Sequence, residues 1–330
     1  MASRDPDSPY PVVAIVGPTA SGKSDLALGI AEEFDGEIVN YDSIQVFRHL
    51  DIGTAKPARE DRDRIPHHLI DILEPTEIFS AGTYQRLARE LLEQLRQRSK
   101  LPVLVGGTGF YLRALVEGLF EGPERSSHLR AKLEATADKR GREHLHRILR
   151  RLDPVSAERI APRDKPKVIR AIEIRMATGR SMSKHLEAEP RRPLTGFDFC
   201  FLGLDPPRPL LYERIETRVR EMFDRGLIEE VRHLIDIGVP RDAKAFEAIG
   251  YSQVLDYLAG NISQEEAIIL MQRETRRYAK RQITWFKRQH AVTWFDGFGD
   301  DEETRKRIHR LIKHYVSNDL VPRRVRQPSV

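Results

Sequence analysis

The feature of this sequence that most constrains its fold is a glycine-rich loop that directly follows a short apolar run. Residues 12–16 are apolar and mostly β-branched, and the loop after them fits the pattern G-x-x-x-x-G-K-[ST]. Such a loop joins a buried parallel strand to a helix and cradles phosphate oxygens with backbone N–H groups. The residues predicted to bind phosphate are Gly17, Pro18, Thr19, Ala20, Ser21, Gly22, Lys23 and Ser24.

Two side chains of this loop carry charge or ligand chemistry. Lys23 supplies a positive charge beside the phosphates, and the Ser24 hydroxyl can ligate Mg²⁺. In motor-type ATPases a second strand ends in an aspartate that holds the metal. The central strand expected here, at 101–105, ends in GGTG instead. Phosphate binding is therefore predicted, whereas the metal-holding strand of a motor-type ATPase is not.

Asp42 is the acidic residue best placed to act at this site. It follows a strand expected at 37–40, and ligands bind at the carboxyl ends of parallel strands. From the residue alone, Asp42 can act as a general base, as a metal ligand through water, or as a cap of the next turn.

Apolar spacing along the rest of the chain indicates an α/β fold. Short apolar runs predict buried strands at 12–16, 37–40, 101–105 and 197–204, and helical spacing predicts helices at 24–34, 83–97, 210–237 and 264–288. The alternation predicts a P-loop NTPase-like core with a mainly parallel sheet. Strand signals stop between 120 and 195, so this segment is predicted to be a helical insertion domain.

The insertion is the basic part of the chain. From Glu124 to Arg192 there are 19 Lys and Arg against 10 Asp and Glu, whereas the rest of the chain carries 36 basic and 40 acidic residues. This segregation favours a polyanion as partner of the insertion. The remaining boundaries are a flexible lead at 1–11, the core at 12–119 and 196–318, and a basic disordered tail at 319–330.

Composition excludes several classes of protein. The chain has 330 residues, 40% of them hydrophobic, and no apolar run long enough to cross a bilayer. Cys200 is the only cysteine, which excludes disulfides within the chain, and its apolar surroundings predict a buried structural thiol. We expect a cytoplasmic protein without membrane contact. His67 and His68 are interpreted as structural, since no further histidine or cysteine joins them.

Taken together, these residues resemble the tRNA dimethylallyltransferases, also called tRNA isopentenyltransferases, of the bacterial type. The stretches that carry the resemblance are GPTASGKS at 17–24, DSIQVF at 42–47, DIGTAKP at 51–57, LVGGTGFYLRAL at 104–115, YERIETRVREMFDRGLIEEV at 212–231 and TRRYAKRQITWFKR at 275–288. They occur in the family's order over nearly the whole chain.

The resemblance implies transfer of a dimethylallyl group from dimethylallyl diphosphate to the adenosine on the 3′ side of the anticodon in tRNA. The loop would then hold the diphosphate as a leaving group, with Mg²⁺ as cofactor at Ser24. Asp42 matches the family's general base, Thr19 a threonine at the bridging oxygen, and Arg218 an arginine at the diphosphate.

The resemblance also implies which residues contact tRNA. They are Asp42, Ser43, Ile44, Gln45, Thr108, Arg130, Pro166, Lys167, Val168, Ile169 and Arg170. Lys167 departs from the frequent arginine and cannot make a bidentate phosphate contact. The arginines at 273, 277, 281 and 288 share one side of a predicted helix, where they can contact RNA phosphates or pair with acids of the fold. The partners expected are the tRNA anticodon arm and dimethylallyl diphosphate, bound by a monomer.

Three other functions fit parts of the sequence. An isopentenyltransferase acting on free adenine nucleotides needs the same loop, but neither the basic insertion nor the long C-terminal helices. A P-loop kinase would use Asp42 to activate an acceptor hydroxyl and would turn over ATP. A nucleic-acid-binding protein would use the loop only as a nucleotide switch.

Overall fold

The computed structural model describes residues 8–120, 122–123, 126–188, 191–289 and 291–317. The chain divides into two compact units, one made of Met1–Val116 with Leu194–Val330 and the other of Glu117–Pro193. The expected insertion, 120–195, thus differs from the second unit by a few residues at each end. Among the described residues, no helix is both long and apolar enough to cross a bilayer.

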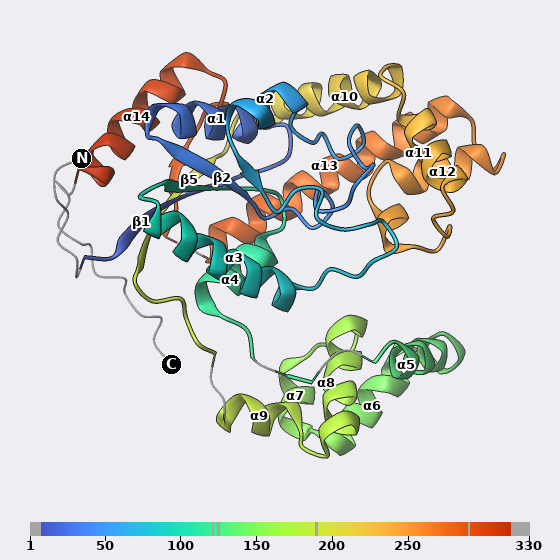
Figure 1. Ribbon diagram of the computed structural model, residues 1–330. Coiled ribbons are helices and arrows are strands. Elements are labelled where there is room, and N and C mark those ends of the chain that lie inside the picture. Colours follow the sequence, from blue (N-terminus) through green and yellow to red (C-terminus); the bar gives the residue numbers. More distant parts are fainter. Residues whose placement is uncertain (1–7, 121, 124–125, 189–190, 290, 318–330) are drawn as a thin grey trace. The chain divides into compact units, whose positions relative to one another are not determined.

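A parallel sheet forms the centre of the first unit (Figure 1). Its order is β3-β2-β4-β1-β5-β6, and every pair of neighbours is parallel. The strands are β1 (Tyr10–Val16), β2 (Gly36–Asn40), β3 (His67–His68), β4 (Leu101–Val105), β5 (Phe197–Leu204) and β6 (Thr293–Phe295). The central strands β1, β2 and β4 are almost wholly buried, and in β2 the buried residues include the polar Glu37 and Asn40 beside Ile38 and Val39.

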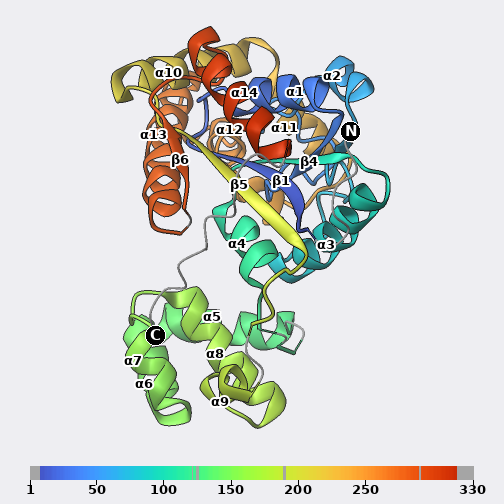
Figure 2. The ribbon, with the colours of Figure 1, turned by 90° about the vertical axis from the view of Figure 1, so that its left-hand side faces the viewer.

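Helices cover both faces of this sheet. Helices α1 (Lys23–Glu33) and α14 (Glu302–Val316) share a hydrophobic core with the strands on one face. Helices α3 (Ala81–Gln97) and α4 (Gly109–Glu117) lie on the other face, as both views show (Figure 1, Figure 2). The predicted α/β fold with a P-loop-like core is confirmed by this arrangement.

The remaining helices of the first unit lie beyond the carboxyl ends of the strands or alongside the sheet. They are α2 (Arg59–Arg64), α10 (Arg208–Asp224), α11 (Leu227–Asp236), η1 (Lys244–Glu247), α12 (Tyr251–Leu258) and α13 (Gln264–Gln289). The helical stretch expected at 210–237 is two helices, because Gly226 between them has a left-handed φ of 98°.

In the residues that the structure describes, the second unit contains five helices around a core of its own. They are α5 (Ser127–Arg140), α6 (Arg142–Leu152), α7 (Pro154–Arg159), α8 (Lys165–Thr178) and α9 (Met182–Ala188). Leu145, Leu149, Ile169 and Ile172 are among its fully buried side chains. Asp153 caps α7 and also accepts hydrogen bonds from the Ser183 N–H and hydroxyl, which ties α7 to α9.

Three local expectations need correction. Tyr10 and Pro11 belong to strand β1, where they pair with Phe197 and Asp198, and are not part of a flexible lead. Strands β3 and β6 were not expected, because runs of two and three residues carry no periodicity. Cys200 is only partly buried, although its surroundings raise the pKa of the thiol to about 12. The expected tail at 319–330 and lead residues 1–7 lie outside the described residues.

Candidate active site

The glycine-rich loop connects β1 to α1 and depends on two of its glycines. Gly17 has a φ of 145° and Gly22 a φ of 81°, conformations that other residues rarely adopt. A Cβ at Gly17 would lie 2.7 Å from the Leu204 carbonyl oxygen, and one at Gly22 would lie 2.9 Å from the Asp300 nitrogen. The loop can therefore take this shape only with glycine at both positions.

Lys23 is buried inside the loop. Its Nζ donates a hydrogen bond of 2.5 Å to the Pro18 carbonyl oxygen, and the residue is 9% exposed. Burial lowers the pKa of Lys23 to about 7; the nearby Arg218 guanidinium contributes to the shift and the Asp42 carboxylate opposes it. Two cations are thus held close together at a place where an anion would stabilise both.

Helix α13 supports the loop from outside. The Thr19 N–H donates to Oε1 of Gln282 over 2.8 Å, and Nε2 of Gln282 donates to the Gly107 carbonyl oxygen over 3.0 Å. Tyr278 donates to the same carbonyl oxygen over 2.9 Å. Gln282 therefore joins the phosphate loop to the loop after β4, a role that its sequence context did not reveal.

A cavity of about 1150 Å³ opens between the phosphate loop and helix α10. Lys23, Ser24 and Asp42 line it from the sheet side, and Arg218 lines it from the helix. Arg214 and Arg225 also line it, although the sequence analysis did not single them out. Their spacing of four and seven residues from Arg218 on one helix could have indicated them.

The segment after β6 closes one side of the phosphate loop. The Gly299 N–H donates to the Ser21 carbonyl oxygen over 2.8 Å. The Arg214 guanidinium lies 3.7 Å from the Phe298 ring centroid and donates to both carboxylate oxygens of Asp300. Arg214 is therefore held by this segment, whereas Arg218 is left to face the cavity.

A second cavity of about 310 Å³ adjoins the first. Both cavities are lined by Thr19, Asp42 and Arg218. The second cavity also has an apolar part, to which α10 contributes Val219 and Met222. The three residues predicted to be catalytic therefore lie where the cavity lined by Lys23 meets a partly apolar one.

Asp42 lies just after β2 in a tight turn. Its Oδ1 accepts hydrogen bonds from the N–H groups of Ile44 and Gln45, over 2.9 and 3.4 Å. Desolvation raises the pKa of Asp42, although these hydrogen bonds and the charge of Lys23 oppose the shift. The side chain thus caps its turn, as one of the three interpretations had it, and it also lines both cavities.

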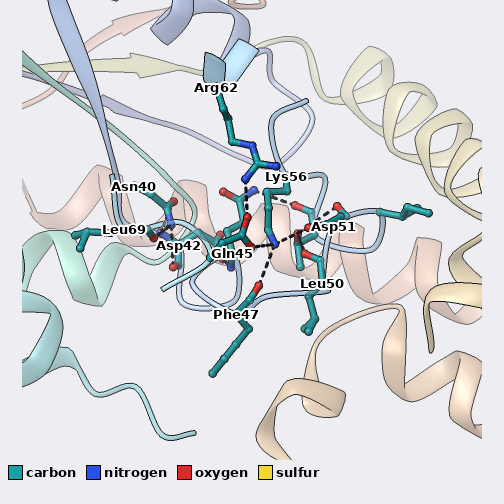
Figure 3. Close-up of polar contacts among 12 residues, drawn as sticks. Asn40, Asp42, Gln45, Phe47, Leu50, Asp51, Lys56, Arg62 and Leu69 are labelled. Atoms are coloured by element: carbon teal, nitrogen blue, oxygen red, sulfur yellow. Dashed lines mark hydrogen bonds and ion pairs between the residues drawn. The ribbon is translucent and has the colours of Figure 1, made fainter. Parts of the chain in front are cut away.

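The neighbours of Asp42 are fixed by the loop after β4. The Ser43 N–H donates to Oγ1 of Thr108 over 3.0 Å, and the Thr108 hydroxyl donates to the Ser43 hydroxyl. Gln45 donates from Nε2 to the carbonyl oxygens of Thr54 and Ala55 (Figure 3). The structure therefore brings the predicted tRNA-contacting residues of the first unit together around Asp42.

The other residues predicted to contact tRNA lie in the second unit. Lys167 is exposed and pairs with Asp164, whereas Arg130 is partly buried and pairs with Glu134. Val168 and Ile169 are core side chains, so their side chains are not available to RNA. Arg170 pairs with the buried Glu173 and donates to the Pro123 carbonyl oxygen. Pro166 lies in the first turn of α8.

The site fits a magnesium ion that is held mainly by other ligands. The Ser24 hydroxyl is exposed and lines the larger cavity. Within the part of the chain that the structure describes, no cluster of three or more His, Cys, Asp and Glu side chains could hold a metal. One hydroxyl suits Mg²⁺, which commonly keeps several waters and binds substrate phosphates. His68 instead contacts Glu37 and His67 contacts the Ile65 carbonyl oxygen, which agrees with structural roles.

Helix α13 presents a basic surface beside the site. A hollow of about 600 Å³ is lined by Arg277, Lys280, Arg281, Thr284, Trp285 and Arg288. Of the four arginines predicted to share this side, Arg273 and Arg277 both approach Glu274, while Arg281 lies over the Tyr278 ring. Two of these arginines thus pair with an acid and three line the hollow, and their contact with RNA phosphates stays a prediction.

The family model of the IPP transferases matches residues 45–289. The chain belongs to this family. Among curated IPP transferase relatives, the tRNA dimethylallyltransferase of Koribacter versatilis is 50% identical over 303 residues, which cover 91% of this chain and 97% of the relative. That of Solibacter usitatus is 52% identical over 296 residues, covering 90% and 96%. The predicted family is therefore confirmed.

Solved structures agree with this assignment. The tRNA isopentenylpyrophosphate transferase of Bacillus halodurans is 41% identical, with a TM-score of 0.69 over 94% of this chain and 97% of that chain. A eukaryotic dimethylallyltransferase described as acting on tRNA is 26% identical, with a TM-score of 0.79 over 97% of this chain and 81% of that chain. The IPP transferase fold thus extends over both units of the chain.

Proposed function

We propose that this protein transfers a dimethylallyl group from dimethylallyl diphosphate to the exocyclic amine of an adenosine in tRNA, next to the anticodon on its 3′ side. The observation that carries the proposal is the meeting of the two cavities at Thr19, Asp42 and Arg218. A diphosphate fits beside Lys23 and Arg218 in the larger cavity, and a short allyl chain fits beside the apolar side chains of the smaller one. The bond between the allylic carbon and the bridging oxygen would then lie where the two cavities meet.

The diphosphate is bound by cations and backbone groups that are already in place. Lys23 would exchange its hydrogen bond with the Pro18 carbonyl oxygen for one with a phosphate oxygen, and Arg218 would approach from α10. The N-terminal end of α1 adds its positive dipole end. These groups stabilise the negative charge that gathers on the leaving diphosphate. A Mg²⁺ ion at Ser24 would add to that stabilisation when bound.

Asp42 is the proposed general base. The adenine amine attacks the allylic carbon, the bond between that carbon and the bridging oxygen breaks, and its electron pair leaves with the diphosphate. One amine proton passes to the Asp42 carboxylate, whose raised pKa makes it a stronger base than an exposed aspartate. Thr19 lies at the junction of the cavities, where its hydroxyl can donate to the bridging oxygen.

Transfer of labelled dimethylallyl diphosphate tests this function. The acceptors are an unmodified anticodon stem-loop with adenosine 3′ to the anticodon and, in parallel, free AMP. We expect label in the stem-loop with Mg²⁺, and Asp42→Ala should lower the rate by about 10²–10⁴-fold. Label in AMP alone would move the assignment to enzymes of free nucleotides. Label in neither, beside an active control enzyme, would refute prenyl transfer.

A further inference from the structure

Glu230 of helix α11 anchors a loop that borders the acceptor side of the site. Its Oε2 accepts hydrogen bonds from the N–H groups of Asp51 and Ile52, over 2.9 and 2.7 Å. Its Oε1 accepts from the Gly53 N–H over 3.1 Å and from the Tyr251 hydroxyl over 2.6 Å. One carboxylate thus receives four hydrogen bonds, three of them from successive backbone amides.

The anchored loop, residues 51–56, is held from its other end by Lys56. Its Nζ donates to the Phe47 carbonyl oxygen over 2.9 Å, to Asp51 over 2.6 Å and to Asp71 over 2.5 Å (Figure 3). The Lys56 side chain is only 1% exposed, and its three donors are all used. Lys56 therefore stabilises the loop through its hydrogen bonds, although it borders the larger cavity.

The anchored loop in turn orients Gln45. Nε2 of Gln45 donates to the carbonyl oxygens of Thr54 and Ala55, over 3.0 and 3.4 Å. Thr54 itself is fixed by a hydrogen bond of 2.6 Å from its hydroxyl to the Leu50 carbonyl oxygen. The Gln45 N–H also donates to Oδ1 of Asp42 and so closes the turn that begins at Asp42. The anchored loop therefore helps to fix the position of this turn.

We propose that Glu230 is a positioning residue for the acceptor nucleoside, acting through the anchored loop and Gln45. The inference rests on the proposed function and deepens it. Glu230 does not line either cavity, so it need not touch a substrate. Its carboxylate fixes the loop whose carbonyl groups aim the Gln45 amide beside the proposed base. The donor's phosphate loop, by contrast, receives none of its four hydrogen bonds.

Glu230→Gln tests the inference with minimal change in shape. Both carboxylate oxygens of Glu230 accept hydrogen bonds, so the NH₂ group of the glutamine replaces one acceptor in either orientation. It would then face N–H or O–H donors with which it cannot form hydrogen bonds. We expect kcat/KM for the stem-loop to fall by about tenfold or more, with the Kd for dimethylallyl diphosphate unchanged within about twofold. Glu229→Gln is the matched control, since Glu229 is exposed and pairs with Arg232 on the same helix.

A double-mutant cycle tests whether the effect of Glu230 on the acceptor depends on Gln45. Gln45→Leu should give the same selective loss for the acceptor, and combining it with Glu230→Gln should cost little more than either change alone. If Glu230→Gln does not fold, Tyr251→Phe takes its place, because it removes one hydrogen bond to Glu230 and should cause a smaller loss in the same direction.

Three outcomes would count against the inference, and each has a different meaning. If the wild-type enzyme transfers label to the stem-loop but Glu230→Gln matches Glu229→Gln, or loses donor and acceptor binding equally, Glu230 has no positioning role. If the two single substitutions are fully additive, the effect does not pass through Gln45. A wild-type enzyme inactive on the stem-loop refutes the proposed function, and the positioning role with it.

Discussion

At the scale of single residues, the site places the side chains of Lys23 and Arg218 close together. Lys23 is buried beside Arg218, and its pKa is lowered to about 7. Near neutral pH part of the protein therefore carries an uncharged lysine at the place where the proposed diphosphate would bind. A bound diphosphate would favour the charged form, so donor binding and protonation of Lys23 should be linked.

This linkage predicts proton uptake on donor binding. Above pH 7 Lys23 is mostly neutral in the empty enzyme, so binding at pH 8 should take up close to one proton, whereas binding at pH 6 should take up almost none. Donor affinity should accordingly weaken as the pH rises above 7. Calorimetry in two buffers of different ionisation enthalpy measures the uptake. Lys23→Arg, whose guanidinium stays charged, is the control for protons taken up by the diphosphate itself. Equal uptake by both proteins at pH 8 would contradict the linkage.

At the scale of elements, helix α13 contributes side chains that hold the loops of the site in place. Gln282 is 4% exposed and supplies the acceptor for the Thr19 N–H as well as a donor to the Gly107 carbonyl oxygen. The same helix carries the basic hollow on its exposed side. One helix therefore stabilises the glycine-rich loop with its inner face and presents a basic hollow on its outer face.

Replacing Gln282 tests this support. Gln282→Met keeps the length of the side chain but leaves the partly buried Thr19 N–H and Gly107 carbonyl group with fewer partners. We expect a loss of about 1–3 kcal/mol in the free energy of unfolding, together with weaker donor binding. Denaturant titration and donor binding measure the two effects. Gln264→Met, at the exposed start of the same helix, should change neither. Unchanged donor binding in Gln282→Met would mean that the phosphate loop keeps its shape without α13.

At the scale of the whole molecule, charge is divided between the two units. The segment 124–192 carries 19 basic and 10 acidic residues, so the second unit has the excess positive charge that the rest lacks. Binding of tRNA should therefore depend steeply on salt, whereas donor binding inside a cavity of the first unit should depend on it less.

Substitution of Lys167 in the second unit tests the predicted salt dependence of tRNA binding. Lys167→Gln should weaken tRNA binding and reduce the slope of log K against log salt by about one, without changing donor affinity. Lys306→Gln is the matched control, because Lys306 is similarly exposed and pairs with Glu302 on its own helix, as Lys167 pairs with Asp164. Equal slopes for Lys167→Gln and the wild type would place the phosphate contacts elsewhere.

The sequence by itself determined the phosphate loop, the α/β class, the family and the cluster around Asp42. Each depends on residues that are close in the chain or on the known order of motifs, and local periodicity encodes the strands and helices directly. Only the tertiary structure decided that Gln282 holds Thr19, that Glu230 holds the loop at 51–53, and that Asp300 holds Arg214. Their partners lie 263, 177–179 and 86 residues away in the chain. A glutamine or a glutamate on a helix carries no local mark of such a partner, because hydrogen bonds at that separation arise only when the packed helices and strands bring the groups together.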